Sequence, residues 1–256
     1  MQKRAGSQCL SLMFPKIDIE SCHMSSLKKI GSLFLILLCG VATAEQHYFG
    51  GVRFDIPNPS HLCKSGNSYA EKKLFSWQED GQARIGSKLL GLWMDCASQS
   101  LLSKGEPKEL EEWMLVVVPK VASEKDLLLR GVSDKEFNAF VSKEMKKIDV
   151  SDEMADIDNV LLNINKKHFL DKDIIKVGEP VDLGLLHVGD AVHTGMLMKV
   201  QAKTVGTRLV LVVSSQLLVK GVWVTFYNYI NYQSREDVKN LLLSARLFAA
   251  KLKSVN

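Results

Sequence analysis

The sequence predicts an α+β domain in which a largely antiparallel sheet is flanked by helices. Two short apolar runs, at 88–96 and 111–119, are bounded by turn residues, as buried strands are. Four later segments between 181 and 232 have strand-like apolar patterns and are separated by turns that contain glycine. The chain then closes with one amphipathic helix after Ser234.

The first 44 residues are predicted to be absent from the mature protein. Residues 24–44 contain a short basic start, an apolar run of at most twelve positions and the small-x-small end Ala42-Thr43-Ala44. This order defines a secretory signal peptide, so we expect cleavage between Ala44 and Glu45. The alternative is an uncleaved signal anchor, which the run disfavours because a membrane-spanning helix needs about 20 apolar residues.

Residues 1–23 show neither helical nor strand periodicity and would make an unusually long start for a signal peptide. We interpret Met24 as the start of translation, and 1–23 as an over-extended reading frame or a disordered segment. A lipid anchor on Cys39 is not expected, because Leu38 rather than a small residue precedes it. The remaining segment, 45–256, contains no repeat or linker that divides it, which predicts a single domain.

Removing residues 1–44 changes the charge balance of the chain. It removes five of 33 basic and two of 29 acidic residues, which leaves 28 basic against 27 acidic side chains in 212 residues. A chain of this length can bury one proper core. A net charge of +1 without long runs of one sign gives no basic surface, so we expect no binding of nucleic acid.

Two of the five cysteines, Cys63 and Cys96, lie in the predicted mature chain. An even number of cysteines in an exported protein indicates a disulfide. Closing a loop of about 34 residues should stabilise the fold by roughly 3–4 kcal/mol. The alternative is a redox or metal-binding pair, but the C-x-x-C spacing typical of such sites is missing.

In the first half of the mature chain, strands alternate with helices. A strand over 52–56 is ended by two prolines, and Ser68 with Glu71 forms a capping box that predicts a helix. The runs at 88–96 and 111–119 are predicted strands, with a short helix at 98–104 between them.

A pair of helices is predicted next. Ser133 and Glu136 form a second capping box, and apolar residues continue at helical spacing to Ile148. After an acidic turn, the same spacing returns over 154–164. The acidic side chains of this pair are interpreted as a solvated face.

The last third of the chain predicts a four-strand antiparallel meander and a helix. Turn residues at Gly189-Asp190, Gly206-Thr207 and Lys220-Gly221 separate the strands 181–186, 195–204, 208–219 and 221–232. The second strand alternates apolar with polar residues, which predicts one solvent-facing side, whereas both sides of the last strand are expected to be covered. Ser234 and Asp237 cap the final helix, whose apolar stripe is predicted to pack on the sheet.

His187 and His193 are the residues that most resemble a metal site. They lie on opposite arms of the Gly189-Asp190 turn, and imidazole is a ligand for zinc or copper. They are six positions apart and lack a third strong ligand nearby in sequence. The simpler interpretation is two partly exposed hairpin histidines, so we expect no metal and no other cofactor.

Motifs for other chemistry are missing from the sequence. There is no G-x-S-x-G elbow, no S-x-x-K at a convincing helix start, no G-x-G-x-x-G and no P-loop. The aromatic side chains of the last strand, chiefly Trp223, Tyr227 and Tyr229, could line a ligand face. Packing of a central strand against a helix explains them more simply, because aromatic residues are enriched in strands.

Three short elements of the mature chain carry a resemblance. They are Ile56-Pro57-Asn58-Pro59 followed by Cys63, Leu89-Leu90 followed by Asp95-Cys96, and the aromatic strand Thr225–Tyr232 with a helix that ends in Asn256. Together they resemble a family of uncharacterised exported bacterial proteins, which has no assigned activity and implies no catalytic residue. The order of elements is also similar to the Mog1/PsbP-type α/β/α sandwich, whose members are usually binding or assembly modules; a shared fold does not fix function.

These observations predict a periplasmic or secreted protein that is a non-catalytic binding or assembly module rather than an enzyme. Its expected partner is an unknown protein or small ligand in the envelope, and no membrane span is expected after cleavage. The alternative function is a metal-dependent or other hydrolase centred on His187 and His193.

Overall fold

The computed structural model describes residues 44–49, 51–106, 110–120, 128–145, 176–178, 180–202 and 206–256. The first half of the chain contains β1 (Glu45–Phe49), β2 (Val52–Ile56), β3 (Leu62–Lys64), α1 (Tyr69–Arg84), β4 (Ser87–Asp95), α2 (Cys96–Ser103), β5 (Glu112–Pro119) and α3 (Asp134–Met145). The second half contains β6 (Lys176–Val177), β7 (Val181–Val188), β8 (Val192–Ala202), β9 (Gly206–Val219), β10 (Val222–Asn231) and α5 (Arg235–Ser254).

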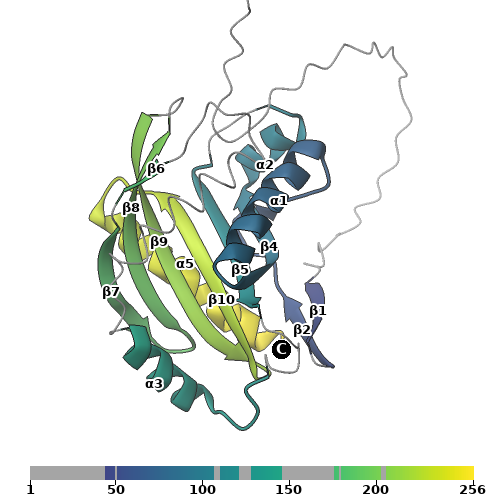
Figure 1. The fold of residues 1–256 in the computed structure, drawn as a ribbon, viewed down its shortest axis with the longest axis vertical. Coiled ribbons are helices and arrows are strands. Elements are labelled where there is room, and N and C mark those ends of the chain that lie inside the picture. The colour runs from purple at the N-terminus through teal and green to yellow at the C-terminus, as the bar shows by residue number, and fades with distance from the viewer. Residues whose placement is uncertain are drawn as a thin grey trace, which may run out of the picture.

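One large sheet organises the described residues (Figure 1). Its eight strands follow the order β3-β4-β5-β10-β9-β8-β6, and β7 also pairs with β8. All of these pairings are antiparallel. The strands β7 to β10 follow one another as neighbours, so the predicted α+β class with a C-terminal four-strand meander is confirmed.

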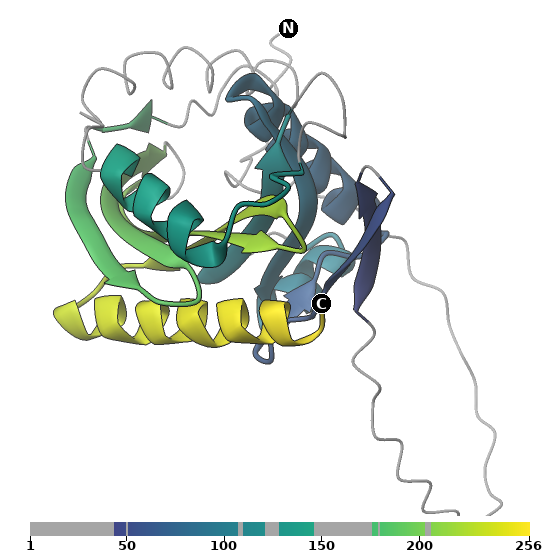
Figure 2. The ribbon, with the colours of Figure 1, turned by 90° about the horizontal axis from the view of Figure 1, so that it is seen from below.

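Helices cover both faces of this sheet (Figure 2). The stripe of α5 packs on one face, where Leu241, Phe248 and Leu252 join side chains of β5, β9 and β10 in the largest core cluster. On the other face, α1 and α2 cover β4 and β5, and α3 covers β8 and β9. This three-layer arrangement confirms the predicted α/β/α sandwich.

The solvent-facing side predicted for the second meander strand is found only in part of β8. Lys199 and Gln201 are exposed there, whereas Met198 and Val200 pack against the cluster under α1. On β9 and β10 both faces are covered, as predicted for β10, because α5 lies on one side and α1 and α3 lie on the other.

Side-chain caps explain where the helices begin. The Ser68 hydroxyl accepts the Glu71 N–H at 3.3 Å, and the Glu71 carboxylate accepts the Ser68 N–H at 3.0 Å. Ser133 and Glu136 make the same exchange before α3. Both predicted capping boxes are therefore confirmed, whereas the second helix of the predicted pair, 154–164, lies outside the described residues.

The edges and turns of the sheet differ in regularity. Lys220 and Gly221 have φ angles of 50° and 80°, the left-handed conformation that a tight turn between β9 and β10 requires. The edge strand β7 shifts register twice against β8, between Asp182 and Gly184 and again between Leu185 and His187. At the other edge, β3 is only three residues long.

The N-terminal hairpin β1-β2 forms a separate two-stranded sheet that lies beside the C-terminus (Figures 1 and 2). Its Phe54 and Ile56 are fully buried in the largest core cluster. The Asn256 side chain accepts the Asp55 N–H and donates to the Asp55 carbonyl oxygen, both at 2.8 Å. The Asn256 side chain, just beyond the end of α5, is therefore hydrogen-bonded to the β1-β2 hairpin.

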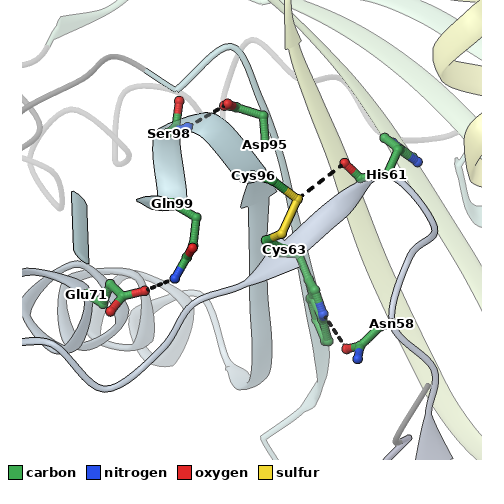
Figure 3. The surroundings of a disulfide bond; sticks show 9 residues. Asn58, His61, Cys63, Glu71, Asp95, Cys96, Ser98 and Gln99 are labelled. Atoms are coloured by element: carbon green, nitrogen blue, oxygen red, sulfur yellow. Dashed lines mark hydrogen bonds between the residues drawn. A yellow bond between two sulfur atoms is a disulfide. The ribbon is translucent and has the colours of Figure 1, made fainter. Parts of the chain in front are cut away.

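The predicted disulfide between Cys63 and Cys96 is present, and it ties β3 to the first residue of α2 (Figure 3). Next to it, the indole N–H of the fully buried Trp93 donates to Asn58 Oδ1 at 3.0 Å. Within the described ranges, none of the helices combines the length and apolar character needed to cross a membrane.

Candidate functional site

A groove of about 380 Å³ lies between α5 and the adjoining ends of β5 and β10, and we call it the α5 groove. Residues 59–61, the loop between β2 and β3, close its third side. Most of its lining is apolar, from Met114, Ile230, Leu241, Leu243, Leu247 and Phe248. Its position follows from the fold. The helix α5 packs on β9 and on part of β10, but it does not cover the adjoining ends of β5 and β10 beside it.

The outer rim of the α5 groove is formed by two leucines, one helical turn apart. Leu243 is 53% exposed and Leu247 is 64% exposed. Neither belongs to the apolar stripe that α5 places on the sheet, so the packing of the domain does not account for them. Two adjacent exposed leucines next to a groove are a local apolar patch of the kind that marks interaction sites.

A buried amide lies on the floor of the groove. Asn228 comes between Phe226 and Ile230 on the side of β10 that faces α5, and its side chain is 1% exposed. The Asn228 Oδ1 atom has no hydrogen-bond partner among the described residues. Burying a polar atom without a partner costs about 1–3 kcal/mol, so such an atom needs an explanation.

Three further polar side chains meet at the mouth of the groove. His61 Nε2 lies 2.8 Å from Glu112 Oε1 and 3.4 Å from Ser244 Oγ. The hydrogen bond with Glu112 raises the pKa of His61, although burial acts in the opposite direction. The residues come from the 59–61 loop, β5 and α5, which only the fold brings together.

These residues are the three types that nucleophilic hydrolases use, but their geometry differs from that of a catalytic triad. A triad histidine takes the serine proton on one ring nitrogen and is oriented by the acid through the other. Here the same atom, His61 Nε2, faces both Ser244 and Glu112. This arrangement therefore supports hydrogen bonding to a ligand at the mouth rather than activation of Ser244.

The two histidines considered as a metal site, His187 and His193, are brought together by β7 and β8. His187 pairs directly with His193, and their ring centres are 5.8 Å apart. His193 is fully buried under α5, so the interpretation of two partly exposed histidines is wrong for this residue. Its Nδ1 lies 2.8 Å from Ser215 Oγ. Among the described residues, no three His, Cys, Asp or Glu side chains group closely enough to hold a metal ion.

Burial lowers the pKa of His193 to about 4, with further contributions from His187 and Arg246. The imidazole is therefore neutral at neutral pH. A neutral imidazole is a potential ligand, but His193 is paired with a serine hydroxyl, and the part of the chain that the structure describes groups no third metal-ligating side chain with the two histidines. The hypothesis of a metal-dependent hydrolase gains no support from this geometry.

The aromatic residues proposed from sequence as a ligand face pack against other side chains. Trp223 meets Phe137 of α3 edge-on at 5.5 Å, and Tyr229 stacks on Trp113 at 4.8 Å. Tyr227 joins the cluster under α1, and burial raises the pKa of both tyrosines. These contacts are those of a packed strand.

The α5 groove was not predicted from the sequence. His61, Glu112 and Ser244 are far apart in the chain, and no periodicity links a loop, a strand and a helix. Two local signals were available. Asn228 interrupts the apolar series that faces α5 on the last strand, and two leucines lie outside the stripe of the last helix.

The fold and the groove define an α/β/α sandwich with one mainly apolar groove beside its C-terminal helix. Neither the protein-family models nor the curated proteins searched contain a match to this chain. The resemblance to exported bacterial proteins and to the Mog1/PsbP-type sandwich therefore stays a prediction, and the α5 groove is the feature that bears on function.

Proposed function

We propose that the mature chain is an exported, non-catalytic binding or assembly module that holds a segment of a partner polypeptide in the α5 groove. The observation that supports it most is the groove itself, with apolar walls, an unpartnered buried amide oxygen and an exposed leucine rim. Ligand sites typically combine a mainly apolar lining with a few oriented polar groups.

The exposed rim favours a polypeptide over a small molecule. A small molecule confined to the groove would cover only those sides of Leu243 and Leu247 that line it. A polypeptide that crosses the rim covers both leucines while one of its side chains enters the groove. Interfaces of this kind bury an apolar anchor at the centre and keep polar groups such as His61 and Glu112 around it.

Two features support export to the periplasm or the medium. The first described strand, β1, begins at Glu45, the residue that follows the predicted cleavage site, and the Lys64 ammonium group pairs with the Glu45 carboxylate. The Cys63–Cys96 disulfide suits an oxidising compartment. Mass spectrometry of the protein recovered from its native compartment should show Glu45 as the first residue. Free thiols at both cysteines would contradict this part of the proposal.

The binding role is tested by site-specific photo-crosslinking in the producing cells. A photoreactive amino acid replaces Leu243 in one variant and Ile85 in a matched control. These side chains are 53% and 54% exposed, and Ile85 lies at the end of α1, across the sheet from α5. We expect a discrete crosslinked species from position 243 that position 85 does not give.

A second variant links that species to the groove. Leu247→Asp places a charge on the rim without touching the core, because this side chain is 64% exposed. It should abolish the crosslink from position 243 while thermal unfolding stays unchanged. Identical products from positions 243 and 85, or a crosslink that survives Leu247→Asp, would refute the proposed function.

A further inference from the structure

We infer that the α5 groove selects a neutral aromatic side chain that carries an N–H donor, namely a tryptophan of the partner polypeptide. This inference rests on the proposed function and specifies which ligand group enters the groove. The residue that supports this inference is Asn228. It lines the groove, is 1% exposed and has an unpartnered Oδ1 atom.

The unpartnered atom determines what the ligand must supply. A carbonyl-type oxygen only accepts hydrogen bonds, so its partner must bring an N–H or O–H group. A purely apolar ligand would dry the groove and leave Oδ1 without any partner. A ligand with a donor at the depth of Oδ1 removes that cost. The groove can therefore distinguish ligands that carry such a donor from purely apolar ones.

The surroundings favour a neutral donor over a charged one. The walls next to Asn228 are apolar, from Met114, Ile230 and Phe248. The carboxylate of the groove, Glu112, already faces His61 at 2.8 Å. A cation that reached Asn228 would lose its hydration without gaining a free carboxylate, which is costly.

The size of the groove and the polarity of its floor fit an indole. A volume of about 380 Å³ is near the lower end for ligand pockets and suits a single large anchor. Indole is an apolar ring with one N–H donor and no acceptor, so it matches the apolar surroundings of the unpartnered Asn228 Oδ1 atom. Tryptophan is also among the side chains that contribute most binding energy at protein interfaces.

The test compares two probes that differ only at this donor. Indole and 1-methylindole have the same ring system, but the second lacks the N–H. Each is titrated into the oxidised chain 45–256, and binding is followed by NMR shifts of Asn228, Leu243 and Leu247. Wild-type protein is compared with Asn228→Leu, which replaces the polar floor with an apolar side chain, and with Leu247→Asn on the exposed rim.

We expect the ratio of indole affinity to 1-methylindole affinity to be about five- to tenfold higher in the wild type than in Asn228→Leu, as for one hydrogen bond. Leu247→Asn should weaken both probes equally and leave the ratio unchanged. If Asn228→Leu does not fold, a wild type that fails to prefer indole would refute the inference. Equal ratios in both proteins would also refute it, and the proposed function would stand if crosslinking from position 243 persists.

Discussion

His193 shows how one buried side chain makes the stability of this domain depend on pH. Its pKa is lowered to about 4 in the folded protein, from an ordinary value near 6.5, chiefly by burial under α5. Between these values the unfolded chain binds a proton that the folded chain does not. Stability is therefore lost as the pH falls from about 6.5 toward 4, by up to about 3 kcal/mol.

Urea unfolding at several pH values checks this prediction. The wild type should lose more stability between pH 7 and pH 4 than His193→Gln. His61 acts in the opposite direction, because its pKa is raised and its contribution is lost as the pH rises. Because His61 is present in both proteins, the comparison with His193→Gln isolates the contribution of His193 to the pH dependence of stability. Parallel pH profiles for wild type and variant would contradict the prediction.

Gly91 is the second residue with a specific steric role. A Cβ atom at this position would lie 2.2 Å from the ring of Trp93, which packs over the glycine on the same side of β4. Trp93 is fully buried and hydrogen-bonded to Asn58, so it has little room to move. Gly91→Ala should therefore lower the free energy of unfolding by about 1–3 kcal/mol.

Chemical denaturation measures this loss, with Gly86→Ala as a comparison. Gly86 has a φ angle of 76° and no atom within 4 Å of the place that a Cβ would occupy, so its substitution strains only the backbone. Gly91→Ala should also shift the fluorescence of Trp93, whereas Gly86→Ala should not. Unchanged stability and fluorescence in Gly91→Ala would contradict the steric explanation.

At the scale of elements, the β1-β2 hairpin depends on the end of α5. The Asn256 amide bonds to both backbone groups of Asp55 and also donates to the Leu252 carbonyl oxygen. Asn256→Ala should lower the free energy of unfolding by about 1–3 kcal/mol. Hydrogen exchange should accelerate most in residues 45–56, and Val255→Ala, a half-exposed neighbour, should change neither quantity.

Individual elements differ in how well the sequence predicts them. Helices were predicted well because Ser68 and Ser133 start them with local side-chain caps, and the meander was predicted because its turns are marked by glycine. By contrast, β1 and β3 were missed. Their pairing partners decide their conformation, and neither strand carries an apolar alternation long enough to recognise.

The candidate site was less predictable than the fold for a physical reason. The α5 groove combines a loop, two strand ends and a helix flank, and its properties arise from what these elements leave uncovered. Periodicity reports which face of an element is apolar, but not where two packed elements fail to meet. The turn predicted at Gly189-Asp190 pairs His187 with His193, yet the burial of His193 depends on the placement of α5.

For the whole molecule, the disulfide is the main covalent constraint. Cys63→Ser with Cys96→Ser should lower the free energy of unfolding by roughly 3–4 kcal/mol, because the unfolded chain regains the freedom of a closed loop. Denaturation of the oxidised wild type against this double variant measures the loss. Reductant should destabilise the wild type to a similar degree and leave the double variant unchanged.

The irregular edges of the sheet have a consequence for the protein at high concentration. At high concentration a long flat strand at a sheet edge would recruit identical strands into fibres. In this molecule β7 is bent by two register shifts, and β3 is three residues long and fastened by the disulfide. Neither described edge offers a template for open-ended polymerisation, although Val181, Leu185 and Val188 of β7 are exposed and apolar.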